Sequence, residues 1–188
     1  LAGPSGAGKT YSALRLAYGL AQDGEEVGVI DTEKESASLY ADKFSFKRLN
    51  LSKYDPESYK KAIKAAENVG IKVLIVDSLS HAWAGTEGLL EKQQKVAQKK
   101  GDSFRAWSEI TPEHNALVDA LLHFDGHIIV TLRTKTEWSY EKDEKTGKLT
   151  PQKVGTKAIF RDGLEYEMTV AFTLDQMNEA QQSKDRTS

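Results

Sequence analysis

The first ten residues contain the motif that most constrains how this chain can fold. Residues 3–10 read Gly-Pro-Ser-Gly-Ala-Gly-Lys-Thr and match G-x-x-x-x-G-K-[ST] at every fixed position. In this pattern backbone N–H groups surround phosphate oxygens, Lys9 reaches the β and γ phosphates, and the Thr10 hydroxyl binds Mg²⁺. An apolar strand end precedes the motif and an amphipathic helix pattern follows it, as the motif requires. We therefore predict a site for a nucleoside triphosphate with Mg²⁺.

Apolar segments typical of strands alternate with amphipathic segments typical of helices along the rest of the chain. The strand candidates are residues 27–31, 71–77, 127–131 and 168–174, with a weaker one at 44–51. Such alternation predicts an α/β fold with a mostly parallel central sheet and helices on both faces. Capping signals predict helices that begin at Asp55-Pro56 and at Thr111-Pro112. The apolar stripes of the first two helices are expected to include Tyr18 and Val69.

Acidic side chains follow two of the predicted strands. Asp77 ends the strand at 71–77 and is the expected second Mg²⁺ ligand beside Thr10, although such an Asp can also simply cap a turn. The residue after it is Ser78, where many hexameric ATPases have a glutamate, so a base for hydrolysis has to come from elsewhere. Glu33 is the candidate, because carboxyl ends of neighbouring parallel strands meet at one rim. The alternative is a rim glutamate that is merely solvated.

Composition narrows the classes of protein. At 188 residues with 39% hydrophobic content, the expectation is one domain over residues 1–188. The chain opens without Met inside an expected strand, so we expect further residues beyond both ends. It has no cysteine and no apolar run of membrane-spanning length, which favours a cytoplasmic protein with no membrane partner. A net charge of −2 removes any whole-chain electrostatic argument for nucleic acid.

Several short blocks resemble RecA-type recombinases. They are Asp31-Thr32-Glu33 with Tyr40-Ala41 seven residues after the glutamate, and residues 73–77 and 129–133. Residues 160–163 with 169–174 resemble the corresponding stretch in replicative helicases of the same superfamily. The whole chain is similar to the phage-encoded proteins known as minimal RecA-like, single-strand-annealing recombinases. Residues 77–83, 111–116 and 183–187 are typical of that group. The fold that the resemblance implies is a RecA-like P-loop NTPase.

The resemblance also implies roles for particular residues. Glu33 would be the catalytic base, and Tyr40 would stack on adenine. Arg133 would lie at the strand end that senses the γ phosphate, where RecA itself has a glutamine. The residues expected to contact ATP are Gly3, Pro4, Ser5, Gly6, Ala7, Gly8, Lys9, Thr10, Tyr11 and Tyr40.

Lys184 and Arg186 resemble a late pair of cations that reaches the γ phosphate of a neighbouring subunit. Residues separated by one point the same way on a strand, so both cations can enter one site together. This role predicts a homo-oligomer, in the form of a ring or a filament. The alternative is a frayed, solvated tail.

Two basic stretches are candidates for contact with single-stranded DNA. Residues 92–105 hold five basic side chains against one acid, and residues 133–161 hold eight against four. Trp107, Trp138 and Tyr140 could stack on bases there. The alternative is that these charges form ordinary solvated faces.

The predicted function is that of an ATP-hydrolysing protein that acts on single-stranded DNA in phage-type recombination or annealing. A single-strand-binding protein is a possible partner, and the missing DNA-gateway domains of larger recombinases put full strand exchange in doubt. Two alternatives stay open. One is a P-loop kinase of a small acceptor, and the other is a DNA-binding module that uses ATP only to control assembly.

Overall fold

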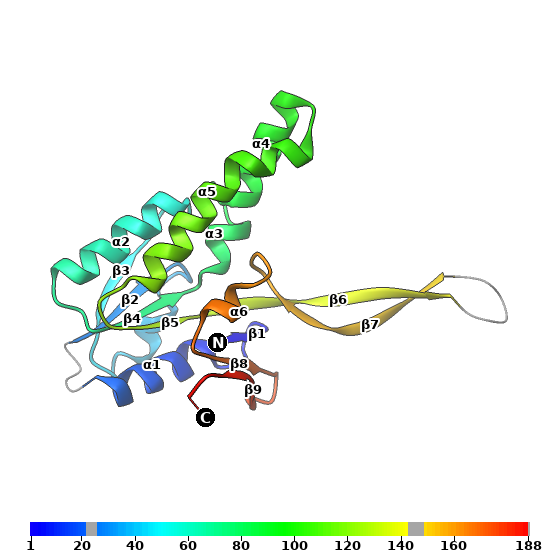
Figure 1. The fold of residues 1–188 in the computed structure, drawn as a ribbon. Coiled ribbons are helices and arrows are strands. Elements are labelled where there is room, and N and C mark those ends of the chain that lie inside the picture. The colour runs from blue at the N-terminus through cyan, green and yellow to red at the C-terminus, as the bar shows by residue number, and fades with distance from the viewer. Residues whose placement is uncertain (22–25, 143–148, 188) are drawn as a thin grey trace.

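The computed structural model describes residues 1–21, 26–142 and 149–187, with side chains left out at 138–142 and 151–154. Helices and strands alternate along the chain, as the pattern predicts (Figure 1). The elements are β1 (Ala2–Gly3), α1 (Lys9–Leu20), β2 (Val27–Asp31), the 3-10 helix η2 (Ser36–Tyr40), β3 (Lys47–Asn50), α2 (Pro56–Asn68), β4 (Val73–Asp77), α3 (Ser80–Ala84), α4 (Leu89–Lys100), α5 (Ser103–Leu122), β5 (His127–Val130), β6 (Leu132–Lys142), β7 (Leu149–Ala158), α6 (Leu164–Glu167), β8 (Val170–Leu174) and β9 (Ala180–Asp185).

The strands form two sheets that meet at Thr131. Within the described residues the first sheet has the order β3-β2-β4-β5 and the second the order β7-β6-β1-β8-β9. Thr131 separates β5 from β6, and its N–H donates to the Val76 carbonyl while the next N–H, of Leu132, donates to Leu1. The pairs between β1, β2, β3, β4, β5, β6 and β8 are parallel, whereas β7 and β9 pair antiparallel at the edges. The prediction of a mostly parallel sheet is confirmed.

The central strand β4 divides the core into two halves because its side chains alternate. Val73 and Ile75 belong to the cluster that contains Leu14 of α1. Leu74 and Val76 belong to the cluster that contains residues of α2 and α5, on the other face. All four β4 side chains are at most 1% exposed, as expected for a strand covered on both sides. Helices therefore lie on both faces of the sheet, as predicted.

Helix α2 begins where its capping signal predicts. The Asp55 side chain accepts a hydrogen bond from the Ser58 N–H, and Pro56 is the first helical residue. Gly70, at φ +78°, follows the end of this helix. The expected burial of two side chains is wrong: Tyr18 is 46% exposed and Val69 is 60% exposed. Tyr18 lies in the last turn of α1, and Val69 is the residue that follows the last residue of α2.

The predicted helix start at Thr111-Pro112 is also wrong. Helix α5 is continuous over Ser103–Leu122 with Pro112 inside it, and Asp102 caps its N-terminus by accepting from two backbone N–H groups. An interior proline typically costs about 3 kcal/mol, because a hydrogen bond is lost. Buried Ala106 and Leu117, on either side of Pro112, continue one apolar stripe that packs with α4 and α2. This packing offsets the cost.

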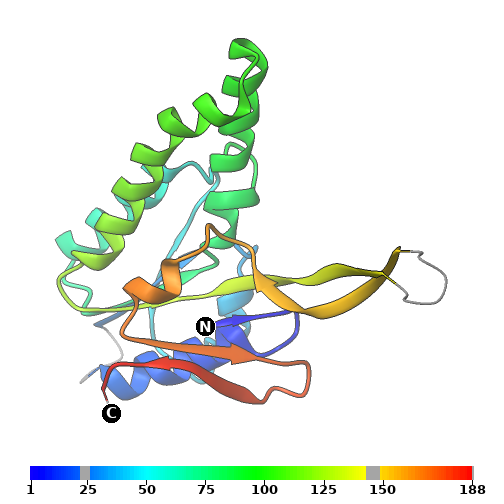
Figure 2. The same cartoon turned by 45° about the vertical axis from the view of Figure 1, so that its right-hand side comes forward.

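Two long hairpins leave the core, and both views show them projecting away from the sheet (Figures 1 and 2). One consists of α4 and α5, and the other of β6 and β7, which pair antiparallel from Thr134 opposite Ala158 to Lys142 opposite Leu149. The segment Lys-Thr-Gly-Lys at 145–148, whose composition predicts a hairpin turn, lies outside the described residues. In the part of the chain that is described, no helix is long and apolar enough to cross a membrane.

Candidate functional site

The motif at residues 3–10 forms a tight loop between β1 and the first turn of α1. Gly6 and Gly8 have φ values of +83° and +78°, in the region that glycine adopts without strain. A Cβ at Gly3 would lie 2.7 Å from the Leu174 carbonyl oxygen, so this position also needs a glycine. Helix α1 begins at Lys9, and its N-terminal N–H groups and dipole favour an anion at the loop.

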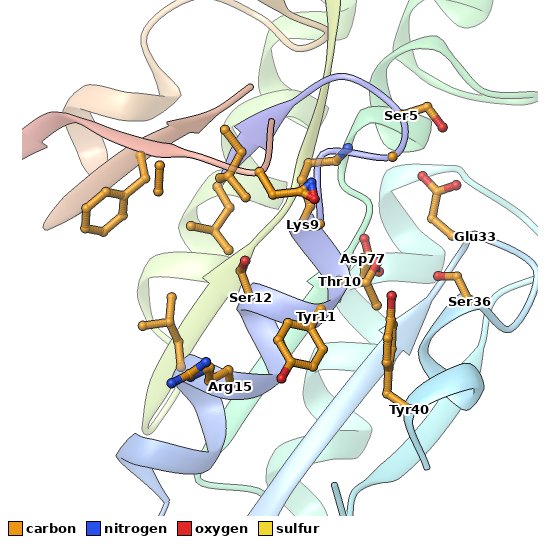
Figure 3. Close-up of a pocket in the computed structure, with 18 of the residues that line it drawn as sticks. Ser5, Lys9, Thr10, Tyr11, Ser12, Arg15, Glu33, Ser36, Tyr40 and Asp77 are labelled. Carbon is orange, nitrogen blue, oxygen red and sulfur yellow. Dashed lines mark hydrogen bonds between the residues drawn. The ribbon is translucent and has the colours of Figure 1, made fainter. Parts of the chain in front are cut away.

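A cavity of about 870 Å³ opens beside this loop. Its volume lies within the range of roughly 300–1,000 Å³ that small-ligand sites occupy. The predicted residues that line it are Ser5, Gly6, Gly8, Lys9, Thr10, Tyr11, Glu33, Tyr40, Asp77 and Arg133. Figure 3 shows Lys9, Thr10 and Asp77 close together near the centre of the view, with Ser5 at the right and Glu33 just below it. Most of the residues that sequence analysis assigned to the nucleotide thus lie around one space.

Asp77 and Thr10 form a short hydrogen bond inside the cavity. The Thr10 hydroxyl donates to Asp77 Oδ2 at 2.6 Å, and the Thr131 hydroxyl donates to Oδ1 at 2.5 Å. Burial raises the pKa of Asp77, which is 1% exposed, although these two hydroxyls oppose the shift. The oxygens of a carboxylate and a hydroxyl are ligands that Mg²⁺ prefers, so the residues fit this ion.

Lys9 bends back over its own loop. Its Nζ donates to the Pro4 carbonyl oxygen at 2.7 Å. Burial lowers the pKa of the ammonium, against the opposing attraction of Asp77 and Glu33. A partly desolvated cation inside a ring of backbone N–H groups suits a phosphate, which would replace the weaker carbonyl acceptor.

The carboxyl ends of β2 and β4 are tied together by side chains. Thr32 Oγ1 accepts from the Ser78 N–H at 2.8 Å and contacts His81 Nδ1 at 2.7 Å. Asp31 Oδ1 accepts from the Glu33 N–H at 2.7 Å. These bonds fix the backbone of Glu33 at the rim that β2 and β4 share.

The carboxylate of Glu33 is held by Arg133 from the start of β6. Arg133 Nε donates to Glu33 Oε1 at 2.7 Å, and a second guanidinium nitrogen contacts Oε2. These hydrogen bonds raise the pKa of Arg133. Glu33 therefore lines the cavity, where sequence analysis placed it, but its oxygens already have a partner. Sequence analysis did not foresee this pair, because no local signal connects residues 100 positions apart.

Two aromatic rings form the wall of the cavity away from the loop. The rings of Tyr11 and Tyr40 lie 5.4 Å apart, and Tyr40 comes from η2 (Figure 3). Aromatic faces of this kind suit a planar base. Ser36, Arg15 and Asn178 also line the cavity, and sequence analysis missed them. No motif contains them, and the turn with Asn178 reaches the loop only in the folded chain, where its side chain would lie 3.9 Å from a Cβ at Gly8.

Lys184 and Arg186 lie side by side, and neither side chain points into the cavity of its own chain. Lys184 Nζ donates to the Tyr166 carbonyl oxygen at 2.5 Å, and Arg186 donates to the same oxygen at 2.7 Å. Lost hydration and the charge of Arg186 lower the pKa of Lys184. Neither residue is among those that line the cavity in the described structure. The structure thus pairs these cations with each other and leaves their predicted role untested.

The two basic stretches differ once they are folded. In residues 92–105, four of the five cations have acidic partners: Lys92 with Glu113, Lys95 with Glu91, Lys100 with Glu109, and Arg105 with Asp102. Most of this charge is therefore neutralised locally. In the second stretch, Lys135 has no ion-pair partner among the described residues. The side chains of Trp138 and Tyr140, predicted to stack on bases, lie outside the described ones.

A family model for an AAA domain matches residues 1–187. No curated protein matches the chain significantly. The match covers nearly the whole chain and includes the loop, the N-terminus of α1 and the Thr10–Asp77 contact. The chain therefore belongs to the AAA domain family of ATPase-type P-loop proteins.

Proposed function

We propose that this protein hydrolyses ATP and couples hydrolysis to single-stranded DNA, in phage-type recombination or annealing. The observation that carries the proposal is the convergence of Lys9, Thr10, Asp77 and Glu33 around one cavity. Hydrolysis of a triphosphate needs a group that binds the phosphates, a metal site and a base. Lys9 supplies the first, Thr10 with Asp77 the second, and Glu33 the third.

The residues divide the work between binding and proton transfer. Lys9 and the loop N–H groups bind the β and γ phosphates, and Thr10 with Asp77 would hold Mg²⁺. When bound, this ion supplies positive charge that offsets the charge on the transferred phosphoryl oxygens. Glu33 takes a proton from the attacking water, whose oxygen forms a bond to the γ phosphorus. The bond between the γ phosphorus and the bridging oxygen breaks, which gives ADP and phosphate.

The Glu33–Arg133 pair determines when the base is available. Both carboxylate oxygens of Glu33 contact the guanidinium, so this pair has to separate before Glu33 can turn to a water. Arg133 lines the same cavity, and a guanidinium binds phosphate with the same two-pronged geometry. The γ phosphate therefore competes for Arg133 and frees Glu33, so that hydrolysis begins only with a triphosphate in place.

The proposed assembly is a homo-oligomer in which Lys184 and Arg186 act on the cavity of the neighbouring subunit. Their position side by side, away from their own cavity, supports this arrangement. Single-stranded DNA as the partner is supported by the resemblance to RecA-like recombinases. A single-strand-binding protein would be a further partner in the same process.

The test is phosphate release from ATP with Mg²⁺, measured against protein concentration with and without oligothymidylate. Glu33→Gln keeps the size of the side chain and removes the base, so we expect kcat to fall by roughly 10²- to 10⁴-fold while ATP still binds. An unchanged rate would remove Glu33 from the mechanism. Formation of ADP only after a small acceptor is added, without matching release of free phosphate, would favour the kinase alternative, because a kinase transfers the phosphoryl group to that acceptor. DNA binding that Glu33→Gln leaves intact, with no turnover in the parent protein, would favour the assembly module.

A further inference from the structure

A second cavity, which we call the aromatic groove, lies where the two projecting hairpins leave the core. Its volume is about 810 Å³. Residues of α3, α4 and α5 line one side of it, and residues of β6, β7 and the segment before α6 line the other. The side chains that matter here are Trp83, Phe104, Trp107, Lys135 and Arg161. None of them belongs to the nucleotide cavity.

The floor of the groove is a stack of flat side chains. Trp83 and Trp107 lie with ring centroids 5.6 Å apart and planes 16° apart. The Arg161 guanidinium carbon lies 5.8 Å from the centre of the Trp107 ring, and one of its nitrogens donates to the Thr111 hydroxyl at 3.2 Å. Phe160 packs against Trp83, with ring centroids 5.9 Å apart. The floor is thus held in place before any ligand binds.

Phe104 stands at the edge of this floor with almost all of its surface in water. It is 87% exposed, more than any other large hydrophobic side chain among the described residues. The structure shows no ring contact for it within the described part of the chain. Since Asp102 caps the helix through the Phe104 N–H, the backbone here is fixed while the ring is free. An exposed ring on a fixed backbone offers a face for a flat ligand at little cost in ordering.

The groove is positively charged. Its basic side chains are Lys135, Lys157 and Arg161, and its acidic side chain is Asp162. Asp162 pairs with Lys157 at 2.7 Å, whereas Lys135 and Arg161 have no ion-pair partner in the described structure. Two uncompensated cations beside exposed and stacked aromatic rings suit a ligand with flat bases and anionic phosphates.

We infer that the aromatic groove binds single-stranded nucleic acid, with a base stacked on Phe104 and phosphates beside Lys135 and Arg161. The inference deepens the proposed function by assigning a binding site to it and rests on that function for the choice of nucleic acid as ligand. Bases that are paired in a duplex present no free face, so stacking selects single strands. The short helix α3 adjoins both sites, because Ser80 Oγ accepts from the Arg133 N–H while Trp83 stacks in the groove.

The test is the affinity of the full chain for fluorescently labelled oligothymidylate, by anisotropy without nucleotide. We expect Phe104→Ala to weaken binding by about 5- to 150-fold, the range found for removing one aromatic partner of a base. Phe104→Tyr keeps a ring and should retain the affinity. Lys135→Ala should weaken binding and reduce the slope of log affinity against log salt by about 1.

The matched controls lie outside the groove. Tyr166→Ala removes another exposed ring, and Lys61→Ala removes an exposed cation on α2, and both should bind like the parent protein. Equal affinity of the parent and Phe104→Ala, or equal loss in Tyr166→Ala, would overturn the inference. If the parent protein binds duplex but not oligothymidylate, or binds neither, the DNA part of the proposed function fails with it. If the parent binds and the groove variants bind equally well, only the groove is wrong.

Discussion

The nucleotide cavity and the aromatic groove have nearly equal volumes, about 870 and 810 Å³, but they differ in whether their side chains already have bonding partners. In the cavity the polar groups form hydrogen bonds with one another. Lys9 donates to the Pro4 carbonyl, Thr10 donates to Asp77, and Arg133 donates to Glu33. In the groove Phe104 and Lys135 are without such partners among the described residues.

The difference concerns what a ligand has to exchange on binding. A triphosphate that enters the cavity replaces contacts that already exist, so its binding rearranges Lys9 and Arg133 and can signal its presence. A base that enters the groove covers exposed surface and breaks no hydrogen bond of the described structure. We therefore expect ligand binding to change side-chain contacts in the cavity and to leave those of the groove unchanged.

The largest effect is expected from Lys184 and Arg186, which line neither the nucleotide cavity nor the aromatic groove of their own chain. Replacing both Lys184 and Arg186 by Ala should lower kcat for ATP hydrolysis by about 10³- to 10⁵-fold, as for loss of an arginine finger. Binding of oligothymidylate in the groove should stay unchanged. Steady-state phosphate release and anisotropy measure the two quantities on the same preparation.

Mixing distinguishes a shared site from a local one. Subunits with Glu33→Gln have intact cations, and subunits with the double replacement have an intact base. A mixture should recover activity if a cavity is completed by its neighbour. Mixtures that stay as inactive as their components at every ratio would show that the cations act elsewhere.

Replacing Lys9 should impair the nucleotide cavity and leave the aromatic groove unaffected. Lys9→Ala takes away the cation that the phosphates need, and we expect turnover to fall by roughly 10²- to 10³-fold, as when one group that stabilises the developing charge is lost. Affinity for a fluorescent ATP analogue should fall as well. Lys64→Ala, an exposed lysine on α2, is the control for charge. Unchanged affinity for the analogue in Lys9→Ala would refute the assignment of the loop.

Stability should respond at the core and hardly at the groove. Leu117 is fully buried between α5 and the sheet, and Leu117→Ala should lower the free energy of unfolding by about 2–5 kcal/mol. Phe104→Ala removes an exposed ring and should change it by less than about 0.5 kcal/mol. Urea unfolding with equal m-values measures both. A cost for Phe104→Ala that approaches the cost for Leu117→Ala would mean that the ring is packed in solution.

The smallest effect concerns pH and the histidine beneath the groove. Burial, with a smaller contribution from Arg161, lowers the pKa of His114, whose ring packs against Trp83 and Phe160. Below pH about 6.5 the unfolded chain then binds more protons than the folded chain. The contribution to stability is therefore full above that pH and is lost as the pH falls from there through the lower pKa of the folded chain. Burial shifts the pKa of His81 in the same direction, so a decline remains after His114 is replaced.

Unfolding free energies at several pH values measure this contribution. The stability of His114→Asn should fall less steeply below neutral pH than the stability of the parent. His123→Asn, at an exposed position outside the aromatic cluster, is the control. A steeper fall in His114→Asn than in the parent would contradict the sign.

Local signals predicted much of the fold correctly. The cap at Asp55, the strand at β4 and the loop before α1 depend on residues within a few positions of one another. The start at Thr111 failed for the opposite reason: packing of α5 on α4 and α2, which no local pattern contains, carries the helix through Pro112. The contact between Glu33 and Arg133 was invisible to sequence analysis in the same way.

The sequence by itself determined which chemical groups the protein has for ATP: a loop of glycines, a lysine and a threonine in fixed order, and acids at the ends of apolar strands. Short-range sterics and hydrogen bonding suffice for that. Only the tertiary structure decided which groups are paired and which are free. It joined Glu33 to Arg133, neutralised most of the charge in residues 92–105, and left Phe104 and Lys135 beside a stack of tryptophans. The physical reason is that pairing depends on distance in space, and the packing of distant segments sets that distance.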